Sequence, residues 1–414
     1  MTPPAAGAAR TTVFRNVRPV GGGWQATGTD VKPVDLAVVD GRIAERPVGA
    51  YETVECGGRL ALPTPVDAHI HPDKTAWGEK WFSRRPADGI ADYCEQDVEL
   101  NRRLATPVGE RSRRLMAHAA AQGTRGMRVH GDVAPAYGLE AVEGLHAARE
   151  ALSHLLHVQI TGFPQHGVNR APGTDKLLER AAREGLIDYV GGIDPAGFDN
   201  AGETGGDSVK AQLDTVFGIA ERHRLGVDIH LHDQGETGLG PLREIIARTR
   251  ALDMAGKVTV SHAFCVPALK GREFDRTAAD LAEAGISLTT VAPDAQRVLP
   301  LKELAEHGVR VGVGSDGVRD SWSPYGNGDM LYRAHLLGFC LDARLDEELA
   351  RCYLTAAHGG AELLGLPAAD LSVGAPADFL LVEGECLPQV VVDMPRRDMV
   401  VRAGRIVARE GKLV

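Results

Sequence analysis

The chain has 414 residues, 43% of them hydrophobic and 25% charged, and its formal net charge is −10 at pH 7. This length suits a large α/β core with an accessory part, and a net acidic chain is a poor partner for nucleic acid. No apolar run reaches the 18 residues of a membrane span. Residues 1–14 lack the basic and apolar segments of a signal peptide, so we expect a short flexible leader and a cytoplasmic protein with six unpaired cysteines.

Both ends of the chain are rich in short strands and turns. Residues 1–60 include two apolar runs joined by Asp40 and Gly41, a dipeptide typical of hairpin turns. Residues 366–414 repeat this style, with turn glycines at Gly404 and Gly411. We therefore expect the two ends to pair into one small β-sandwich domain, with an N-terminal part over residues 1–60 and a C-terminal part over residues 366–414.

The middle of the chain, residues 61–365, alternates apolar β-branched runs with helix-like stretches. Eight strands are predicted, at 61–69, 126–132, 157–163, 188–194, 226–232, 257–262, 286–292 and 309–316. Helices are predicted between them, at 138–154, 174–185, 207–224, 240–256 and 276–285. Strands that alternate with helices form parallel sheets, and eight such units indicate a (β/α)8 barrel of the TIM type. Residues 76–125 form a long first connection that is expected to overhang the barrel mouth.

Polar side chains gather at the carboxyl ends of these strands, which meet on one face of a barrel. They are His69 and His71, His130 and Asp132, Gln165, Asp194, His230, His232 and Asp233, His262, and Asp316. Side chains two apart on a strand point the same way, so His69 and His71 can reach one ion together. Imidazole and carboxylate ligands suit Zn²⁺ or Fe²⁺, and a bound metal lowers the pKa of a water ligand to about 7. The pattern predicts metal-assisted hydrolysis.

The chain resembles the amidohydrolase superfamily, and within it the cytosine deaminase branch, over nearly its whole length. The resemblance rests on the segments HIHPDKT at 69–75, FPQ at 163–165, DIH at 228–230, SH at 261–262 and GSDGVRDSWSPYGNGDML at 314–331. The last segment is similar to the pattern D-x-x-x-D-P-W-x-P-x-G of that branch. The resemblance implies a distorted (β/α)8 barrel with a β domain made from both chain ends, in agreement with the strand and helix pattern.

The resemblance also implies roles for particular residues. The ligands of one Zn²⁺ or Fe²⁺ would be His69, His71, His230 and Asp316. Asp316 would also take the proton of the attacking water, and His262 would contact that water or the developing oxyanion. Gln165 would bind the carbonyl and ring NH of the substrate, and Trp322 would wall the pocket. From its position at a strand end, Asp194 either binds a substrate amine or caps the following helix.

Three departures from the family pattern bear on the substrate. Asp233 stands where the family has a glutamate three residues after the third metal histidine, so the proton shuttle is either Asp233 or Glu236. Gly317 replaces an aspartate that faces substrate in the family, and His166 follows FPQ where an acid is common. The metal ligand is assigned to His230 and not to His232, because that register places an acid three residues later.

The sequence therefore predicts a hydrolase that deaminates a nitrogen heterocycle, such as a cytosine-like pyrimidine or a related cyclic amidine, by metal-hydroxide attack. Two alternatives stay open. One is hydrolysis of an N-substituted amino heterocycle or an amide with release of an amine, for which the changes at Asp233 and Gly317 leave room. The other is a barrel that has lost its chemistry and serves as a scaffold. Small-molecule heterocycles are the expected partners, without nucleic acid or membrane, and a homo-oligomer is one option.

Overall fold

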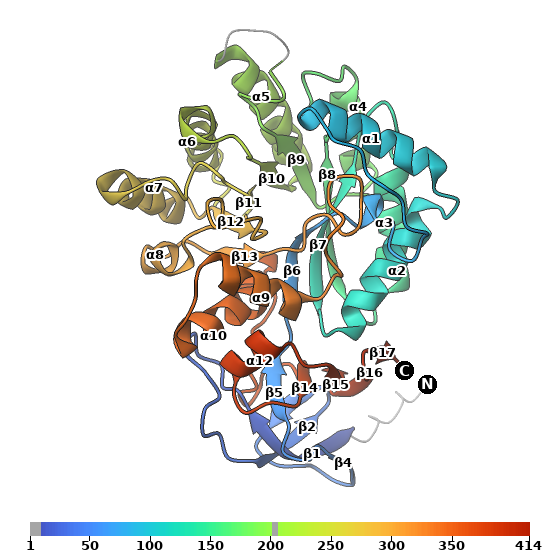
Figure 1. Ribbon diagram of the computed structural model, residues 1–414, viewed down its shortest axis with the longest axis vertical. Coiled ribbons are helices and arrows are strands. Elements are labelled where there is room, and N and C mark those ends of the chain that lie inside the picture. The colour runs from blue at the N-terminus through green and yellow to red at the C-terminus, as the bar shows by residue number, and fades with distance from the viewer. Residues whose placement is uncertain (1–9, 201–205) are drawn as a thin grey trace, which may run out of the picture.

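The computed structural model describes residues 10–200 and 206–414 of the chain. Its larger part is a sheet of eight strands that curls into a barrel, with the strands paired in chain order (Figure 1). The barrel strands are β6 (Val66–Ile70), β7 (Gly126–Asp132), β8 (His157–Phe163), β9 (Tyr189–Ile193), β10 (Gly226–His230), β11 (Val258–Ser261), β12 (Ser287–Thr290) and β13 (Val311–Val313). All seven neighbouring pairs are parallel, as the alternation of strands and helices predicts.

The first predicted strand, 61–69, is divided between two sheets. Its beginning belongs to β5 (Leu60–Pro63), which pairs outside the barrel, and only β6 enters the barrel. Pro63 and Pro65 lie at the break, and proline has no N–H to donate to a continuous ladder. The barrel closes beyond the other end of β6, where Ile70 pairs in parallel with Asp316.

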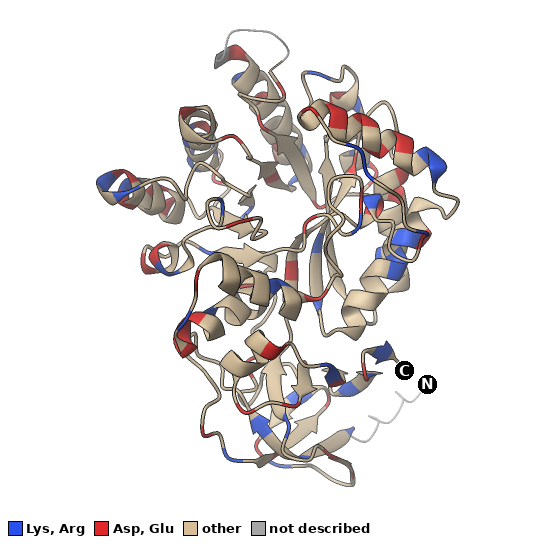
Figure 2. Ribbon diagram, viewed as in Figure 1, with Lys and Arg blue, Asp and Glu red and all other residues tan. Residues whose placement is uncertain are grey.

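Helices surround the barrel and carry charged side chains of both signs (Figure 2). The long first connection contains the 3-10 turn η1 (Pro72–Lys74) and helices α1 (Ile90–Arg103) and α2 (Val108–Ala121). The predicted helices correspond to α3 (Glu140–Ala151), α4 (Thr174–Arg183), α5 (Gly206–His223), α6 (Gly235–Ala251) and α7 (Gly271–Glu283). Later helices are α8 (Leu301–Glu306), α9 (Met330–Cys340), α10 (Asp346–Leu354), the π-helical turn η2 (Thr355–Gly359), α11 (Gly360–Leu364) and α12 (Leu387–Asp393). Within the described ranges, none of these helices is long and apolar enough to cross a membrane.

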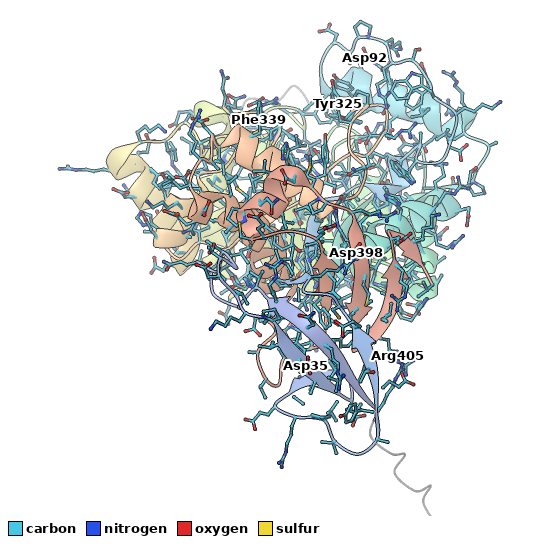
Figure 3. The ribbon with its side chains drawn as sticks, turned by 60° about the horizontal axis from the view of Figure 1, so that its bottom comes forward. Asp35, Asp92, Tyr325, Phe339, Asp398 and Arg405 are labelled. Carbon is cyan, nitrogen blue, oxygen red and sulfur yellow. The ribbon has the colours of Figure 1, made fainter. Side chains whose placement is uncertain are left out.

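The two ends of the chain form a separate nine-stranded sheet, which lies away from the barrel mouth (Figures 1 and 3). Its strands are β1 (Thr11–Pro19), β2 (Val34–Val39), β3 (Arg42–Ala44), β4 (Tyr51–Glu55), β5, β14 (Phe379–Val382), β15 (Arg397–Arg402), β16 (Arg405–Arg409) and β17 (Lys412–Leu413). The first half of β1 pairs with β2 and β4, and its last two residues pair with β5. Side chains from both groups of strands share one buried cluster, in which Phe14 and Phe379 meet edge to face at 5.0 Å.

The leader expected over residues 1–14 is shorter than predicted. β1 already begins at Thr11, where Val13 is buried and Phe14 belongs to the cluster just described. Residues 1–9 lie outside the described part of the chain, so the prediction of a flexible segment applies only to them.

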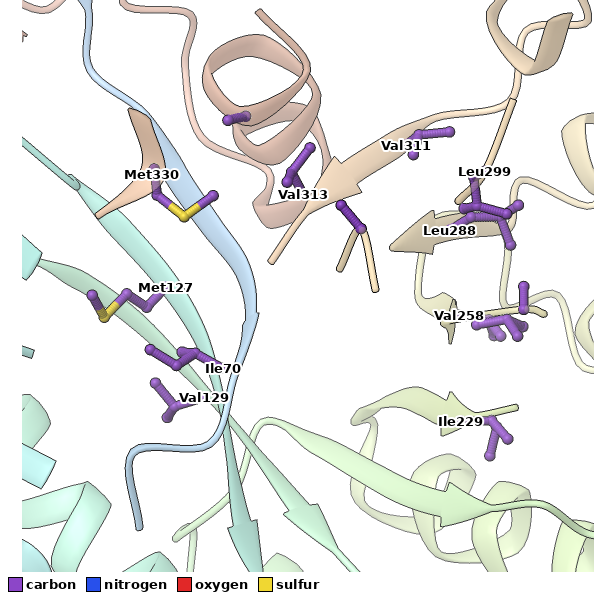
Figure 4. Close-up of a cluster of buried hydrophobic side chains, with 14 of the residues drawn as sticks. Ile70, Met127, Val129, Ile229, Val258, Leu288, Leu299, Val311, Val313 and Met330 are labelled. Carbon is purple, nitrogen blue, oxygen red and sulfur yellow. The ribbon is translucent and has the colours of Figure 1, made fainter. Parts of the chain in front are cut away.

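The packing of the apolar core determines which strand residues face the interior of the barrel near its mouth. Ile70, Val129 and Ile229 come from three barrel strands and belong to one buried cluster that includes side chains of the surrounding helices (Figure 4). Since side chains alternate along a strand, the neighbours of these residues face the barrel interior. His69 and His230 are such neighbours, and both are at most 2% exposed.

Candidate metal centre and substrate cavity

Three imidazoles and one carboxylate converge at the carboxyl ends of β6, β10 and β13. The Nε2 atom of His71 lies 3.3 Å from Nε2 of His69 and 3.2 Å from Nε2 of His230. The Oδ1 atom of Asp316 lies 3.7 Å from Nε2 of His69 and 3.5 Å from Nε2 of His71. The backbone holds this arrangement, because the N–H of Asp316 donates to the carbonyl of His69 at 2.9 Å.

The protonation of these side chains suits a cation between them. Burial lowers the pKa of His69, His71 and His230 well below the usual value, so the rings are neutral and each offers one lone pair. A single hydrogen or lone pair on Nε2 of His71 cannot point at two other nitrogen atoms at once, whereas one cation satisfies all of them. Three imidazole nitrogens and one carboxylate oxygen form a set that fits Zn²⁺ or Fe²⁺.

Two further histidines belong to the same cluster. A nitrogen of His130 lies within 4.8 Å of ligand atoms of His69 and His230, and a nitrogen of His262 lies equally close to His69 and Asp316. The ring of His130 stacks on that of His71 at 5.0 Å. Nε2 of His71 directly faces the Nε2 atoms of His69 and His230, whereas His69, His130 and His230 form a group whose ligand atoms all lie within 4.8 Å of one another. His262 lines the substrate cavity, where both its nitrogens have no hydrogen-bond partner among the described residues.

The backbone at these strand ends is strained. Asp194, His262, Ala292 and Asp316 follow four different barrel strands, and their φ angles are +33°, +69°, +47° and +59°. Side chains other than glycine rarely adopt this left-handed region, and each such residue costs about 1–3 kcal/mol. These residues lie where the chain leaves the barrel strands at the mouth, and backbone strain of this kind is typical of functional sites.

A cavity of about 900 Å³ opens above the centre. One side is polar and includes Lys74, Gln165 and His232. The lining of the cavity also includes apolar and aromatic side chains, among them Ile90, Tyr93, Val291, Pro293, Leu336 and Phe339, together with the charged residues Asp294 and Arg297. Trp322 lines the cavity and stacks on Tyr93 with ring centroids 4.7 Å apart. The rim residues Tyr325 and Phe339 are 73% and 81% exposed and lie at the opposite end of the molecule from the terminal sheet (Figure 3).

A buried network fixes the polar side of the cavity. Lys74 forms an ion pair with Asp132 at 3.0 Å and donates to Oε1 of Gln165. Nε2 of Gln165 donates to Asp97 of α1 at 3.3 Å, and Asp97 also accepts from Ser321 at 2.8 Å. Although burial acts to lower it, the carboxylates around Lys74 raise the pKa of this amine, so Lys74 is a cation and only donates.

The two residues proposed from the sequence as proton shuttles do not face the cavity. The carboxylate of Asp233 accepts from the backbone N–H of Gly197 at 2.9 Å, and burial raises its pKa to about 6. Glu236 lies on the surface in a 3.0 Å ion pair with Arg243. Both belong to the turn and helix that follow β10, so their side chains no longer follow the direction of the strand.

His232 faces the cavity, whereas the expected proton shuttles Asp233 and Glu236 do not. Its ring lines the cavity, with its centroid 4.3 Å from that of His262. Nδ1 of His232 contacts Oδ2 of Asp194 at 2.8 Å, and the backbone N–H groups of His232 and Asp233 donate to Oδ1 of Asp194. Asp194 is therefore engaged by His232 and is not available for a substrate amine or for the next helix. Although burial acts to lower it, the Asp194 carboxylate raises the pKa of His232.

Gly317 leaves room that another carboxylate fills. A side chain at position 317 would overlap the carboxylate of Asp320. Asp320 is 1% exposed, and its Oδ1 accepts from the backbone N–H groups of Trp322 at 2.9 Å and Ser323 at 2.8 Å. Asp320 corresponds to the second aspartate of the pattern D-x-x-x-D-P-W quoted above, and in this chain its carboxylate fills the space beside Gly317.

The fold and the site together define a barrel hydrolase with a cluster of potential metal-ligating side chains at the barrel mouth. The amidohydrolase family model matches residues 108–408, and the chain belongs to this family of enzymes, which hydrolyse C–N bonds other than peptide bonds. The matched region begins after β6, so it does not include His69 and His71. The place of these two residues in the site follows from the structure.

Solved and curated relatives cover almost the whole chain. The crystal structure of N-isopropylammelide isopropylaminohydrolase from Burkholderia multivorans ATCC 17616 is 38% identical, covers 98% of this chain and 100% of its own, and has a TM-score of 0.88. N-isopropylammelide isopropyl amidohydrolase of Pseudomonas sp. (strain ADP) is 29% identical over 92% of this chain and 94% of its own. The fold is also shared with 5-methylcytosine deaminase from Klebsiella pneumoniae, at 23% identity, TM-score 0.77 and coverage of 96% and 98%.

Sequence reasoning missed several residues of the site. Asp97 lies in the long first connection, where no motif marks it. Lys74 follows the two opening histidines, but its sequence position gave no chemical role. His232 was weighed only as the alternative to His230 as a metal ligand. The one available signal for His232 was Asp194, since a carboxylate at the end of a neighbouring parallel strand is within reach of an imidazole.

Proposed function

We propose that the enzyme hydrolyses the exocyclic C–N bond of an N-substituted amino group on a nitrogen heterocycle and releases an amine. The observation that carries this proposal is the size of the cavity, which is lined by apolar and aromatic side chains as well as by polar ones. A cavity of about 900 Å³ lies near the upper limit of the roughly 300–1,000 Å³ range for drug-sized ligands, whereas a bare pyrimidine is far smaller. The similarity to two N-isopropylammelide hydrolases along their full length supports an alkyl substituent on the leaving nitrogen.

Gln165 supports a ring that carries a carbonyl next to a ring N–H. Lys74 only donates, so the amide oxygen of Gln165 faces it, and Asp97 accepts from the amide nitrogen. The amide orientation is therefore fixed from both sides. It keeps one lone pair on Oε1 and one hydrogen on Nε2, the complement of a ring N–H beside a carbonyl.

The side chains of the site divide the proton transfers between them. A divalent cation held by His69, His71, His230 and Asp316 would supply Lewis acidity and lower the pKa of water toward 7. The Asp316 carboxylate accepts a proton from the attacking water, and burial raises its pKa toward that task. His232, kept protonated by Asp194, donates a proton to the leaving nitrogen, and His262 donates to the oxygen that develops at the attacked carbon. Water adds oxygen to the ring carbon, and the C–N bond breaks to give the oxo heterocycle and the amine.

The experiment compares leaving groups on one ring. The Zn²⁺- or Fe²⁺-loaded enzyme is given a matched pair of hydroxylated triazines or pyrimidines that carry either NH₂ or an N-alkylamino group, and ammonia and amine are measured separately. We expect a higher kcat/KM for the N-alkyl compound. Release of ammonia alone, with no turnover of any N-alkyl compound, would instead establish a deaminase, the function predicted first from the sequence.

A further inference from the structure

The motifs DIH and SH contain two polar residues that the mechanism above does not use. Asp228 lies two residues before the end of β10, Ser261 is the last residue of β11, and both are 0% exposed. The hydroxyl of Ser261 has three neighbours: Oδ1 of Asp228 at 2.6 Å, Nδ1 of His69 at 3.0 Å and Oγ1 of Thr289 at 2.9 Å. It therefore stands between a buried carboxylate and a residue assigned to the metal centre.

The direction of each hydrogen bond in this chain follows from the groups themselves. A carboxylate only accepts, so the single hydrogen of Ser261 points at Asp228. Toward Thr289 and His69, the Ser261 oxygen must then accept. It follows that Nδ1 of His69 carries the ring hydrogen, and that Nε2 of the neutral ring keeps its lone pair on the side of His71 and Asp316.

Arg128 fixes the other end of the chain. Its Nη1 donates to Oδ2 of Asp228 at 3.2 Å and to Thr259 at 2.6 Å, and its guanidinium lies 3.8 Å from the ring centre of Tyr189. Arg128 is 1% exposed and has no acceptor atom. One oxygen of Asp228 is thus held by a permanent donor, and the other oxygen faces Ser261.

We propose that Asp228 is a positioning residue that acts through Ser261 to hold His69 in the Nδ1–H tautomer and so directs its Nε2 lone pair at the metal centre. Partners of this kind around metal-binding histidines commonly change metal affinity by about 10–100-fold when they are removed. The inference rests on the metal centre of the proposed function, but not on the identity of the substrate.

The variant Asp228→Asn reverses the chain with almost no change in shape. Arg128 requires an acceptor, so the amide oxygen of the asparagine turns toward it and the amide NH₂ faces Ser261. Ser261 then accepts from this NH₂ group, and its own hydrogen is free to point at His69. When the hydrogen of Ser261 points at His69, Nδ1 accepts it and the ring hydrogen moves to Nε2, where the metal would bind, whereas in the wild type this arrangement is closed off because Asp228 only accepts.

Two measurements on the full chain test this reasoning. The first is Zn²⁺ affinity by chelator competition, for wild type, Asp228→Asn, Ser261→Ala and the matched control Thr289→Val. Thr289→Val removes a contact to the same hydroxyl without changing where its hydrogen points. We expect affinity losses of about 10–100-fold for the first two variants, with the larger loss in Asp228→Asn, and a change within about threefold for Thr289→Val.

The second measurement is ¹⁵N NMR of histidine side chains in metal-depleted protein, with His69 assigned by comparison with a His69→Gln variant. We expect Nδ1–H in the wild type and a shift toward Nε2–H in Asp228→Asn. Wild-type Zn²⁺ affinity in both Asp228→Asn and Ser261→Ala, or Nε2–H in the wild-type protein, would overturn the proposal. If Asp228→Asn does not fold, Ser261→Ala and the wild-type spectrum still decide. Neither readout needs a substrate, so failure of the proposed function would show separately, as absence of amine release by an enzyme whose tautomer is as expected.

Discussion

Asp320→Asn should make the protein more stable at alkaline pH and leave its stability unchanged in acid. Burial raises the pKa of Asp320 from 3.8 to about 7, and the residue is 1% exposed. Its Oδ1 accepts two backbone N–H groups, and the amide oxygen of asparagine can accept both. The substitution therefore keeps the turn and removes a buried charge.

The magnitude follows from the difference between the two pKa values. The folded state binds the Asp320 proton more tightly than the unfolded state, so stability is complete below pH 3.8 and falls as pH rises toward 7. At 1.36 kcal/mol for each pKa unit, the penalty is roughly 2 kcal/mol at pH 5 and on the order of 4 kcal/mol above pH 7. Asp320→Asn should gain this amount over the wild type, with the difference growing between pH 4 and pH 8.

Urea unfolding of metal-depleted protein at several pH values measures this difference. The other titrating groups are shared by the two proteins, so their contributions cancel in the comparison. Asp342→Asn, which removes an exposed charge paired with Arg344, is the matched control and should change the free energy of unfolding by no more than about 1 kcal/mol. A constant difference for Asp320→Asn, or a variant that becomes relatively less stable toward pH 8, would refute the reasoning.

Further outcomes concern the centre and the proton donors. Asp316→Asn should lose turnover and weaken Zn²⁺ binding, because it removes an anionic ligand and a base; wild-type rates would contradict its role. His232→Gln should lower kcat by about 10²–10⁴-fold. Glu236→Gln should change kcat by no more than about twofold, because Glu236 is exposed and paired with Arg243. Steady-state kinetics measure both variants, and a larger loss in Glu236→Gln would show that the assignment of His232 is wrong. Gly314→Ala should lower the metal affinity, and it should lower the free energy of unfolding by about 1–3 kcal/mol, because a Cβ at position 314 would overlap His69. Chelator competition and urea unfolding measure the two effects. No change in either would mean that the two strands can move apart without cost.

The barrel was predictable because its signals are local. Strands such as 126–132 and 157–163 are short β-branched runs between turns, and the structure places β7 and β8 at the same residues. The strand predicted at 61–69 failed locally as well, since Pro63 and Pro65 break it between two sheets. The rule that strand ends of a barrel share one face predicted that the polar residues after these strands gather at the mouth, and the resemblance implied His69, His71, His230 and Asp316 as the ligands among them.

The polar network was not predictable, because it depends on contacts between distant segments. Asp97 reaches Gln165 from a helix 68 positions earlier in the chain. The sequence predicts a strand over residues 226–232, but β10 ends at His230. The alternation of side chains along a strand therefore does not describe the direction of the His232 side chain. Its partner Asp194 has a φ of +33°, which no sequence pattern announces. The resemblance pointed to an acid at position 233, whose carboxylate contacts the backbone of Gly197 and is not among the lining of the cavity.

The strand β5 has a consequence for how the protein is made. It pairs with β14, whose residues follow it in the chain by about 300 positions. During synthesis, Phe14 and its neighbours on β1 and β2 stay without Phe379, their partner in the cluster, until nearly the whole barrel has emerged. Contacts of such long sequence separation form slowly. The terminal sheet is therefore the last part to assemble, and a chain that ends before β14 would leave the apolar side chains of β1 and β2 without their partner strands.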